Sequence, residues 1–404
     1  MPMDREPKSA ADIQGMLDGL YAEDTADFAR REPDWAFSAG SEHDEIARSA
    51  FNQFGPDVFA PIFPGCVSAA TFEADLVNAW LPYVGGDETA HGITTSGGSE
   101  SIMLAVHAAV QYAKRKGQNT LGGEIIAADT AYPGIDKTAA AYQLKIKRVP
   151  LNDALQMDVD AVQEAITDRT LMIFASAPTF HYGTADDIVG LGAVAQKEDV
   201  WLHVDACIGG FLAPFLRRAG VDIPPCDLSV DGVRSICADA HKYGYTFPAV
   251  SMLFYKDRTD FEASGFLVGG PIMFQATMHT LTGTRSSGAV AAAWAAMHSL
   301  GETGFEEAAA KIAGAVKQIC NGIDAMDGVK LYNDPKYAIV TFFAEGVDMM
   351  RLLEQMRMGD RPWALSPLAR PIGAFNMLVA PSYVDRIDTF LNDLKTAVAA
   401  NSLS

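Results

Sequence analysis

Short apolar segments alternate with amphipathic segments from about residue 90 onward, and this alternation predicts the fold. Uninterrupted apolar runs predict strands over 124–128, 171–177, 200–206, 235–238 and 251–255. Between them, apolar residues recur three and four positions apart and predict helices, most clearly over 100–116. Because the strands are rich in Val, Ile and Leu and lack polar alternation, we expect both faces of the sheet to be covered. The order of the elements therefore predicts an α/β fold with a mainly parallel, doubly wound sheet.

The same pattern divides the chain into three parts. Residues 1–60 are rich in acidic side chains and predict an N-terminal arm or a segment of short helices. Residues 61–300 hold the alternating strands and helices of a large domain. Residues 301–404 predict a smaller C-terminal α/β domain, with a long helix over 305–325, strands that include 338–343 and 376–380, and a last helix over 384–399.

Composition and charge exclude several classes of partner. The chain has 404 residues, of which 49% are hydrophobic and 20% are charged, as in globular proteins. Its 31 basic and 51 acidic residues give a formal net charge of −20, which argues against nucleic acid or an anionic membrane as the main partner. The chain contains neither an apolar run of the roughly 20 residues that span a bilayer nor a signal-peptide core. We therefore expect a cytoplasmic protein that binds neither nucleic acid nor a membrane.

The cysteines predict buried, reduced thiols. They are odd in number, scattered along the chain and never spaced as Cys-x-x-Cys, so we expect neither a disulfide framework nor a structural metal site. The five are Cys66, Cys207, Cys226, Cys237 and Cys320.

A glycine-rich segment opens the clearest predicted helix. Gly97 and Gly98 allow close approach to the backbone, and Ser99 adds a hydroxyl where the helix begins. The free N–H groups and the positive dipole end of a helix start bind anions, most naturally a phosphate. The alternative is an ordinary glycine-rich turn in which Ser99 caps the helix.

An aspartate ends an otherwise apolar predicted strand. Strand alternation puts Trp201, His203 and Asp205 on one face, with Asp205 at the carboxyl end, where open α/β sheets bind ligands. Such a carboxylate is costly to bury unless it meets a cation or hydrogen-bond donors. A strand-end Asp that caps the next turn is the alternative, and a His-x-Asp pair of non-haem iron ligands is a more remote one.

A lysine follows another buried strand and lies among aromatic residues. Lys242 is preceded by His241 and followed by Tyr243 and Tyr245. In such surroundings we expect the lysine to be costly to charge and its amine to be nucleophilic. A phosphate cradle, a carboxylate and a Schiff-base lysine together are what pyridoxal phosphate requires, so the ordered set of three segments predicts this cofactor.

The motifs also resemble a known family, the group II decarboxylases among the fold-type-I pyridoxal-phosphate enzymes, and within it the sphingosine-1-phosphate lyase subgroup. The resemblance covers about residues 60–305. It is carried by the segments 62–65 (Ile-Phe-Pro-Gly), 96–101 (Ser-Gly-Gly-Ser-Glu-Ser), 203–211, 241–245 (His-Lys-Tyr-Gly-Tyr) and 282–285 (Thr-Gly-Thr-Arg). It implies a fold-type-I enzyme with a large cofactor-binding domain and a smaller C-terminal domain.

The resemblance implies a role for each matching residue. Lys242 would hold the cofactor as a Schiff base and act as the catalytic residue, and Asp205 would bind the pyridine nitrogen. The phosphate would lie among Gly98, Ser99 and His241, with Gly283 and Thr284 contributed by a second chain, which implies a homodimer with shared active sites. The family's histidine that stacks on the cofactor ring aligns with Tyr132, so an aromatic stack is kept while the imidazole is lost.

Two reactions remain open for this site. The resemblance favours a carbon–carbon lyase of the aldehyde-lyase type, with His181 or Tyr182 as candidate bases; the alternative is an amino-acid α-decarboxylase, with Arg285 near the substrate carboxylate. A catalytically silent homologue is a remote alternative. The lyase subgroup has a Pro-Lys-Gly segment after the tyrosines, whose lysine helps to bind a substrate phosphate, whereas this chain reads Thr-Phe-Pro-Ala-Val over 246–250. We therefore expect a soluble amine or an amino-acid-like substrate.

Overall fold

The computed structural model describes residues 8–28, 37–60, 65–270, 273–358, 363, 365–369 and 373–402. Of the motif at 62–65, only Gly65 falls within these ranges, and Ile62 to Pro64 lie outside the described residues. Among the described residues, no helix has both the length and the apolar composition that are needed to cross a membrane.

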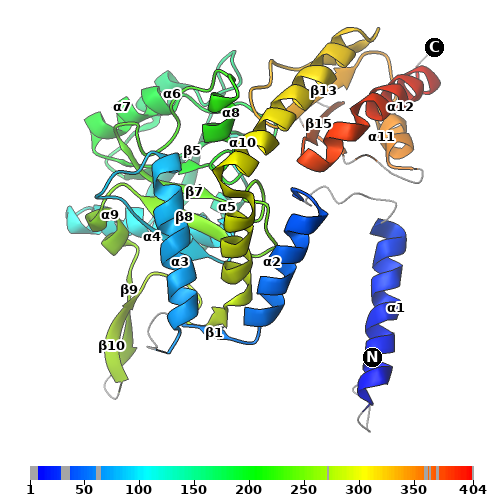
Figure 1. Cartoon of the computed structure of the whole chain (residues 1–404). Coiled ribbons are helices and arrows are strands. Elements are labelled where there is room, and N and C mark those ends of the chain that lie inside the picture. The colour runs from blue at the N-terminus through cyan, green and yellow to red at the C-terminus, as the bar shows by residue number, and fades with distance from the viewer. Residues whose placement is uncertain are drawn as a thin grey trace.

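A seven-stranded sheet forms the centre of the molecule (Figure 1). All of its strands run parallel except β8, which lies antiparallel between β2 and β7. The prediction of a mainly parallel sheet is therefore confirmed. In spatial order the strands are β2 (His91–Thr95), β8 (Ser251–Tyr255), β7 (Val233–Ala238), β6 (Trp201–Asp205), β5 (Thr170–Ser176), β3 (Glu124–Ala128) and β4 (Lys145–Val149).

Helices cover both faces of this sheet, as its apolar strands require. One face packs against α4 (Gly98–Arg115), α5 (Gly134–Ala141) and α9 (Arg258–Ala263). The other face packs against α3 (Val67–Trp80), α6 (Val159–Ala165), α7 (Ile188–Glu198), α8 (Ala213–Arg218) and α10 (Gly288–Asp324). Trp201, Phe174 and Cys237 belong to the α4 face, whereas Leu202, Val204 and Ile236 belong to the opposite face. Alternate residues of one strand thus enter two separate cores.

The C-terminal part forms a second, smaller sheet of four antiparallel strands. Their order is β12 (Val329–Leu331), β13 (Ile339–Ala344), β15 (Ala374–Leu378) and β14 (Leu365–Pro367). α11 (Met349–Met356), the 3₁₀ helix η2 (Pro381–Arg386) and α12 (Ile387–Ala400) accompany it. The helix predicted over 305–325 is part of the longer α10, which is interrupted at Gly301 (φ 57°, ψ −179°). The boundary near residue 300 between two domains stays a prediction.

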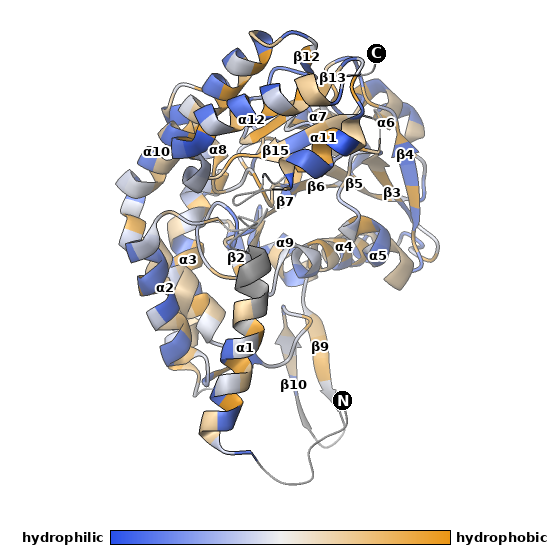
Figure 2. Cartoon of the chain, turned by 90° about the vertical axis from the view of Figure 1, so that its right-hand side faces the viewer, coloured by the Kyte–Doolittle hydropathy of each residue, from blue (hydrophilic) through white to orange (hydrophobic). Residues whose placement is uncertain are grey.

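The N-terminal part is helical, with longer helices than the sequence predicts. α1 (Ala10–Phe28) stands apart from the body of the molecule in Figure 1 and lies in front of it in Figure 2, whereas α2 (Ser41–Phe54) packs against α10. The hairpin of β9 (Phe266–Gly270) and β10 (Met273–Met278) also projects from the body. The remaining elements are β1 (Val58–Phe59), which pairs with β11 (Arg285–Ser286), and the 3₁₀ helix η1 (Leu81–Val84).

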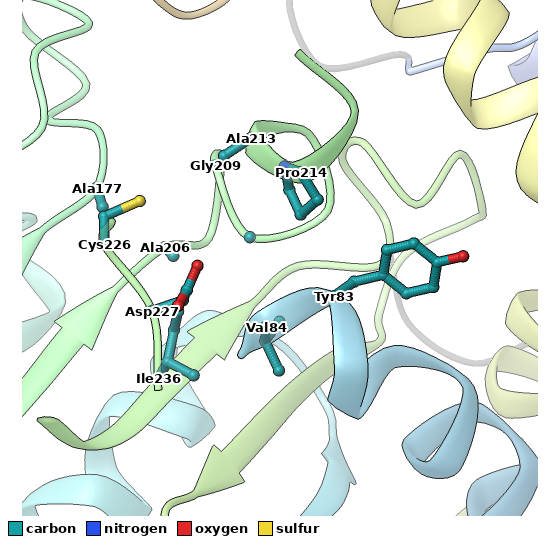
Figure 3. A pocket seen from close by; sticks show the side chains of 11 residues that line it. Tyr83, Val84, Ala177, Ala206, Gly209, Ala213, Pro214, Cys226, Asp227 and Ile236 are labelled. Carbon is teal, nitrogen blue, oxygen red and sulfur yellow. The ribbon is translucent and has the colours of Figure 1, made fainter. Parts of the chain in front are cut away.

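Figure 3 shows a narrow pocket on the side of the sheet away from α4. Ala206 and Ile236 line it, and these residues alternate along β6 and β7 with residues of the other face. Its carboxylate, Asp227, accepts hydrogen bonds from Arg217 Nη1 at 3.1 Å and from Ser229 Oγ at 2.6 Å. Because protein donors already occupy this carboxylate, the pocket is structural and the chemistry lies elsewhere.

Candidate active site

The three segments singled out in the sequence meet at the carboxyl edge of the central sheet. A Cβ atom placed on Gly98 would lie 2.7 Å from Cys207 Sγ and 3.0 Å from Asp239 Oδ1. A Cβ atom on Gly97, whose φ is +141°, would lie 4.0 Å from the His241 ring. The start of α4 therefore touches both the segment after β6 and the segment after β7. Only glycine at position 98 permits this approach without displacing a neighbour.

Side chains fix the turn that begins α4. Glu100 is buried, and its Oε2 accepts a hydrogen bond from the Ser96 N–H at 2.7 Å. Its Oε1 accepts a hydrogen bond from the Leu281 N–H at 2.8 Å. Ser99 stays exposed at the edge. The first N–H groups of an 18-residue helix are thus held at the edge with their dipole end facing the site.

Asp205 is the last residue of β6, and its side chain is buried at 6% exposure. Its Oδ1 accepts a hydrogen bond from the Cys207 N–H at 3.1 Å. Burial raises the pKa of Asp205, while hydrogen bonds from Cys207 and the charge of Lys242 oppose this rise. The carboxylate predicted at a strand end is therefore present, but few protein donors compensate for its burial.

Lys242 forms an ion pair with a carboxylate that the sequence analysis did not single out. Its Nζ lies 3.0 Å from Asp239 Oδ2, and its side chain is 16% exposed. Burial alone would lower the pKa of Lys242, but the negative charge of Asp239 and the more distant Asp205 outweigh it and raise the pKa. The expectation that this lysine is costly to charge is therefore wrong. Asp239 lies only three residues before the lysine, but the sequence does not show that the turn between them brings the carboxylate to the amine.

The neighbours of Lys242 tie it to other parts of the molecule. His241 Nδ1 lies 2.6 Å from the carbonyl oxygen of Val250, so this nitrogen carries the proton and donates. Tyr243 donates a hydrogen bond to the carbonyl oxygen of Val379 at 3.0 Å, which reaches the C-terminal region. His43 of α2 lies 2.7 Å from the carbonyl oxygen of Tyr245. Contacts from both ends of the chain thus hold the lysine segment in place.

Other predicted residues lie at the surface or take different partners. Tyr132 is 48% exposed in the loop after β3. Gly283 and Thr284 are exposed between β10 and β11, and their predicted contact with a second chain stays a prediction. Arg285 donates to the carbonyl oxygen of Thr94 at 2.7 Å and pairs with Glu73 at 3.0 Å, so it ties β11 to β2 and α3 of its own chain. This arrangement favours a structural role for Arg285.

The two candidate bases also differ in their surroundings. Tyr182 is buried, and its ring stacks on Tyr332 with the ring centroids 5.2 Å apart. His181 contacts the backbone of Thr130 in the loop after β3, and burial lowers its pKa, so the imidazole is neutral at pH 7. His181 therefore suits a proton-accepting role better than Tyr182.

The structure also brings together two cysteines that the sequence separates by 30 residues. Cys207 Sγ lies 3.5 Å from Cys237 Sγ, close to Asp205. All five cysteines are free thiols, but Cys66, Cys207 and Cys320 are only partly buried, so the expectation of buried thiols holds for two of the five. The pairing of strands β6 and β7 creates this contact, and no local spacing signals it.

Comparison with known proteins identifies the family. Residues 72–345 match the model of the pyridoxal-dependent decarboxylase conserved domain. The chain belongs to the pyridoxal-dependent decarboxylase family. This membership confirms the predicted cofactor, pyridoxal 5′-phosphate, and the predicted class, a pyridoxal-phosphate-dependent lyase.

The similarity extends over most of the chain. The chain is 34% identical to a sphingosine-1-phosphate lyase from Oryza sativa over 90% of its own length and 68% of that protein. It is 35% identical to the corresponding lyase from Arabidopsis thaliana, over 82% of its own length and 61% of that protein. A sphingosine-1-phosphate lyase structure from Burkholderia pseudomallei superimposes with a TM-score of 0.92 at 26% identity, covering 99% of this chain and 93% of that one. The chain thus spans about three-fifths to two-thirds of these curated plant relatives.

The fold is also shared with a less similar chain. A glutamate decarboxylase from Lactobacillus brevis superimposes with a TM-score of 0.84 at 19% identity and covers 99% of this chain. At this identity the likeness concerns the fold alone. The predicted fold-type-I architecture is confirmed.

Polar groups at the site edge fit such a cofactor. Four buried side-chain oxygens lack a hydrogen-bond partner among the described residues and lie on loops that follow β3, β5 and β7. They are Thr130 Oγ1, Thr179 Oγ1, Asp239 Oδ1 and Thr246 Oγ1. Buried polar atoms are nearly always paired, so their clustering at one sheet edge suits a polar ligand. The adjacent start of α4 suits the anionic part of that ligand.

Proposed function

We propose that this chain is a carbon–carbon lyase of the aldehyde-lyase type, which uses pyridoxal phosphate to cleave a bond next to an amine-bearing carbon. The observation that carries the proposal is the convergence of Lys242, Asp205 and the start of α4 at one sheet edge. The similarity to sphingosine-1-phosphate lyases over 90% of the chain supports this reaction. When bound, the cofactor withdraws electrons from the substrate carbon that bears the amine.

Each site residue has a role in the proposal. Lys242 would be the catalytic residue that holds the cofactor aldehyde, and Asp205 would keep the pyridine nitrogen protonated. The N–H groups of Gly98 and Ser99, together with His241, hold the phosphate. The dipole of α4 offsets part of its charge, which suits a site with few formal cations.

The remaining groups position the ligand and carry protons. Asp239 holds the Lys242 ammonium at 3.0 Å whenever the amine is free. Tyr132, exposed in the loop after β3, provides an aromatic face for the cofactor ring. His181, neutral at pH 7, accepts the proton of a substrate hydroxyl.

The loop after Tyr245 supports a substrate other than a sphingoid phosphate. Phe247 occupies the part of the chain where the lyase subgroup has its second lysine. Its ring packs edge-on against Phe51 of α2, with centroids 6.3 Å apart, and contacts the apolar cluster that includes Ala292 and Ala296. Phe247 is thus an apolar anchor at the position of that lysine, and the Arg48 guanidinium lies 5.2 Å from its ring centroid. A soluble amine or amino-acid-like substrate suits this loop.

We also propose a cytoplasmic homodimer in which the active sites are shared. Ile13, Met16, Leu17 and Leu20 recur at helical spacing along α1, and all are exposed. A second copy of the chain would cover this face, and its Gly283 and Thr284 would reach the phosphate. Mixing Lys242→Ala with Gly283→Trp, each inactive alone, then restores activity, because each hybrid dimer contains one intact site. Failure of every mixture of soluble variants would exclude shared sites.

An amino-acid decarboxylase is the second candidate. The chain is 28% identical to a probable L-tyrosine/L-aspartate decarboxylase from Methanothermobacter thermautotrophicus, over 82% of that protein. The deciding assay supplies the holoenzyme with amino alcohols, their phosphates and amino acids, and measures aldehyde and CO₂ separately. Aldehyde release that depends on Lys242 supports the lyase. Release of CO₂ from an amino acid without aldehyde would overturn it in favour of the decarboxylase.

A further inference from the structure

The buried side chains of Cys237 and His203 and the partly buried thiol of Cys207 form a group behind Asp205. Cys237 lies opposite Asp205 in the β6–β7 pairing and is completely buried. Its Sγ lies 3.6 Å from Asp205 Oδ1, 3.5 Å from Cys207 Sγ and 3.6 Å from His203 Nε2. Cys237 therefore connects the carboxylate to the interior of the sheet.

The group continues away from the site through two more side chains. His203 Nδ1 lies 2.8 Å from Ser235 Oγ, and Trp201 Nε1 donates a hydrogen bond to the same oxygen at 2.9 Å. The side chains of Trp201, His203 and Ser235 are completely buried. All of them lie on the face of the sheet that α4 covers, because they alternate with residues of the other core.

The chemistry at the two ends fits one direction of hydrogen bonding along this chain of contacts. An indole N–H can only donate, and an ionised carboxylate can only accept. Burial lowers the pKa of His203 to about 3, so its imidazole is neutral and has one donor and one acceptor. The pairing of the Cys237 thiol as donor to Asp205 Oδ1 fits the His203 tautomer in which Ser235 donates to Nδ1 and Nε2–H donates to the sulfur of Cys237.

The two thiols carry the protons that hydrogen-bond donation requires. The ligand atoms of Asp205, Cys207 and Cys237 lie within 4.8 Å of one another. Burial raises the pKa of Cys237 to about 11, and the neighbouring thiol and burial together raise the pKa of Cys207. Both thiols thus keep their protons at neutral pH.

We propose that Cys237 is a positioning residue, which donates a hydrogen bond to Asp205 under the control of His203 and thereby keeps this carboxylate ionised for the cofactor. This rests on the proposed function only in the role of Asp205. A donor stabilises the charged form of a carboxylate, so loss of the thiol raises the pKa of Asp205. Cofactor binding then weakens, and it weakens most on the acidic side of the pH range.

The test measures cofactor affinity in three variants. Apo-protein is titrated with pyridoxal phosphate between pH 5.5 and 8.5 and followed by visible absorption. For Cys237→Ala we expect the dissociation constant to rise about tenfold on the acidic side of this range, where the raised pKa leaves Asp205 protonated in the apo-protein. The acidic limit of binding should also move up by about one pH unit. Cys237→Ser keeps a donor and stays within about threefold of the native protein.

The controls separate the proposed role from a packing defect. Cys320→Ala removes a thiol from α10, far from Asp205 in the sequence and outside the site, and leaves the affinity unchanged. Urea unfolding of each apo-variant identifies any loss of stability. A general packing defect would lower stability without moving the acidic limit of binding. Cofactor affinity in folded Cys237→Ala equal to that of the native protein would overturn the proposal.

A second measurement does not depend on the cofactor. The infrared S–H stretching band that disappears in Cys237→Ala belongs to this thiol. If the thiol donates to Asp205, the band moves to higher frequency in Asp205→Asn apo-protein, because a neutral amide is a weaker acceptor. An unmoved band would overturn the hydrogen bond, whatever the function. Failure of the native protein to take up pyridoxal phosphate would instead overturn the proposed function.

Discussion

Two buried carboxylates lie beside neighbouring strand ends, and their surroundings differ: Asp205 ends β6, whereas Asp186 lies in the loop after β5 and contacts the last residue of that strand. Asp186 is 2% exposed; its Oδ1 accepts the Met157 N–H at 2.7 Å and its Oδ2 accepts the Ser176 N–H at 2.8 Å. Ser176 lies opposite Asp205 in the pairing of β5 with β6. Asp205 accepts one backbone N–H at 3.1 Å and faces a thiol at 3.6 Å.

The difference separates a structural carboxylate from a functional one. Backbone N–H groups at short distance bind both oxygens of Asp186, and these donors belong to segments that the carboxylate holds together. Asp205 has longer and weaker donors, and the charge of Lys242 acts on it. A buried carboxylate that its own chain satisfies only weakly can form a strong ion pair with a cationic ligand.

Replacing Asp205 should weaken cofactor binding strongly, whereas replacing Asp186 should leave it nearly unchanged. Asp205→Asn removes the anion that meets the pyridine nitrogen, and breaking a buried ion pair costs about 3–5 kcal/mol, so we expect the dissociation constant to rise roughly hundredfold or more. Asp186→Asn, the matched control, should leave it within about threefold. Titration of apo-protein with pyridoxal phosphate measures both. Equal losses in the two variants would show that the distinction is wrong.

Asp186 should instead affect how the stability of the folded protein depends on pH. Burial raises its pKa to about 6 although its two N–H donors oppose this, so the folded state binds more protons than the unfolded state between about pH 4 and 6. This contribution is greatest below pH 4 and is lost as the pH rises through 6. The stability of the native protein relative to Asp186→Asn should therefore fall by about 3 kcal/mol across this range. Urea unfolding of both proteins at several pH values measures this difference. If the two plots of stability against pH run parallel, the raised pKa of Asp186 is wrong.

A smaller loss of cofactor affinity should follow from adding a side chain at Gly98, next to the segment that holds Asp205. A methyl group on Gly98 would lie 2.7 Å from Cys207 Sγ, the residue whose N–H binds Asp205. We expect Gly98→Ala to weaken cofactor binding about tenfold by displacing this contact. Gly314→Ala in α10, where a methyl group meets nothing within 4 Å, is the control. An unchanged affinity in Gly98→Ala would place the cofactor elsewhere.

The strands that the sequence predicts correctly are those buried on both faces. Every residue of β5, β6 and β8 is buried, and such strands are uninterrupted apolar runs. The strands at the two edges, β2 and β4, were not predicted. β4 reads Lys-Ile-Lys-Arg-Val, and only its last residue is buried, so its basic residues resemble a solvated surface. An edge strand has no need for apolar residues on both faces.

The candidate site divides in the same way between local and long-range features. Gly98, Asp205 and Lys242 stand out because each breaks or ends a regular local pattern. Contacts between different strands produce no recognisable local pattern in the sequence. The contact of Cys207 with Cys237 depends on the register of β6 against β7, which the sequence does not reveal. The charge state of Lys242 likewise depends on how the turn after β7 folds Asp239 back toward the amine.

The central claim is that Lys242 binds the cofactor, and borohydride reduction tests it most directly. Reduction of the yellow holoenzyme, followed by digestion and mass spectrometry, should find the phosphopyridoxyl group on the peptide that contains Lys242. Lys242→Ala should lose this adduct and its turnover, whereas Lys256→Ala, a lysine whose amine donates to the carbonyl oxygen of Leu228, should keep both. A reduced protein without an adduct, or with the adduct on another lysine, would contradict the account.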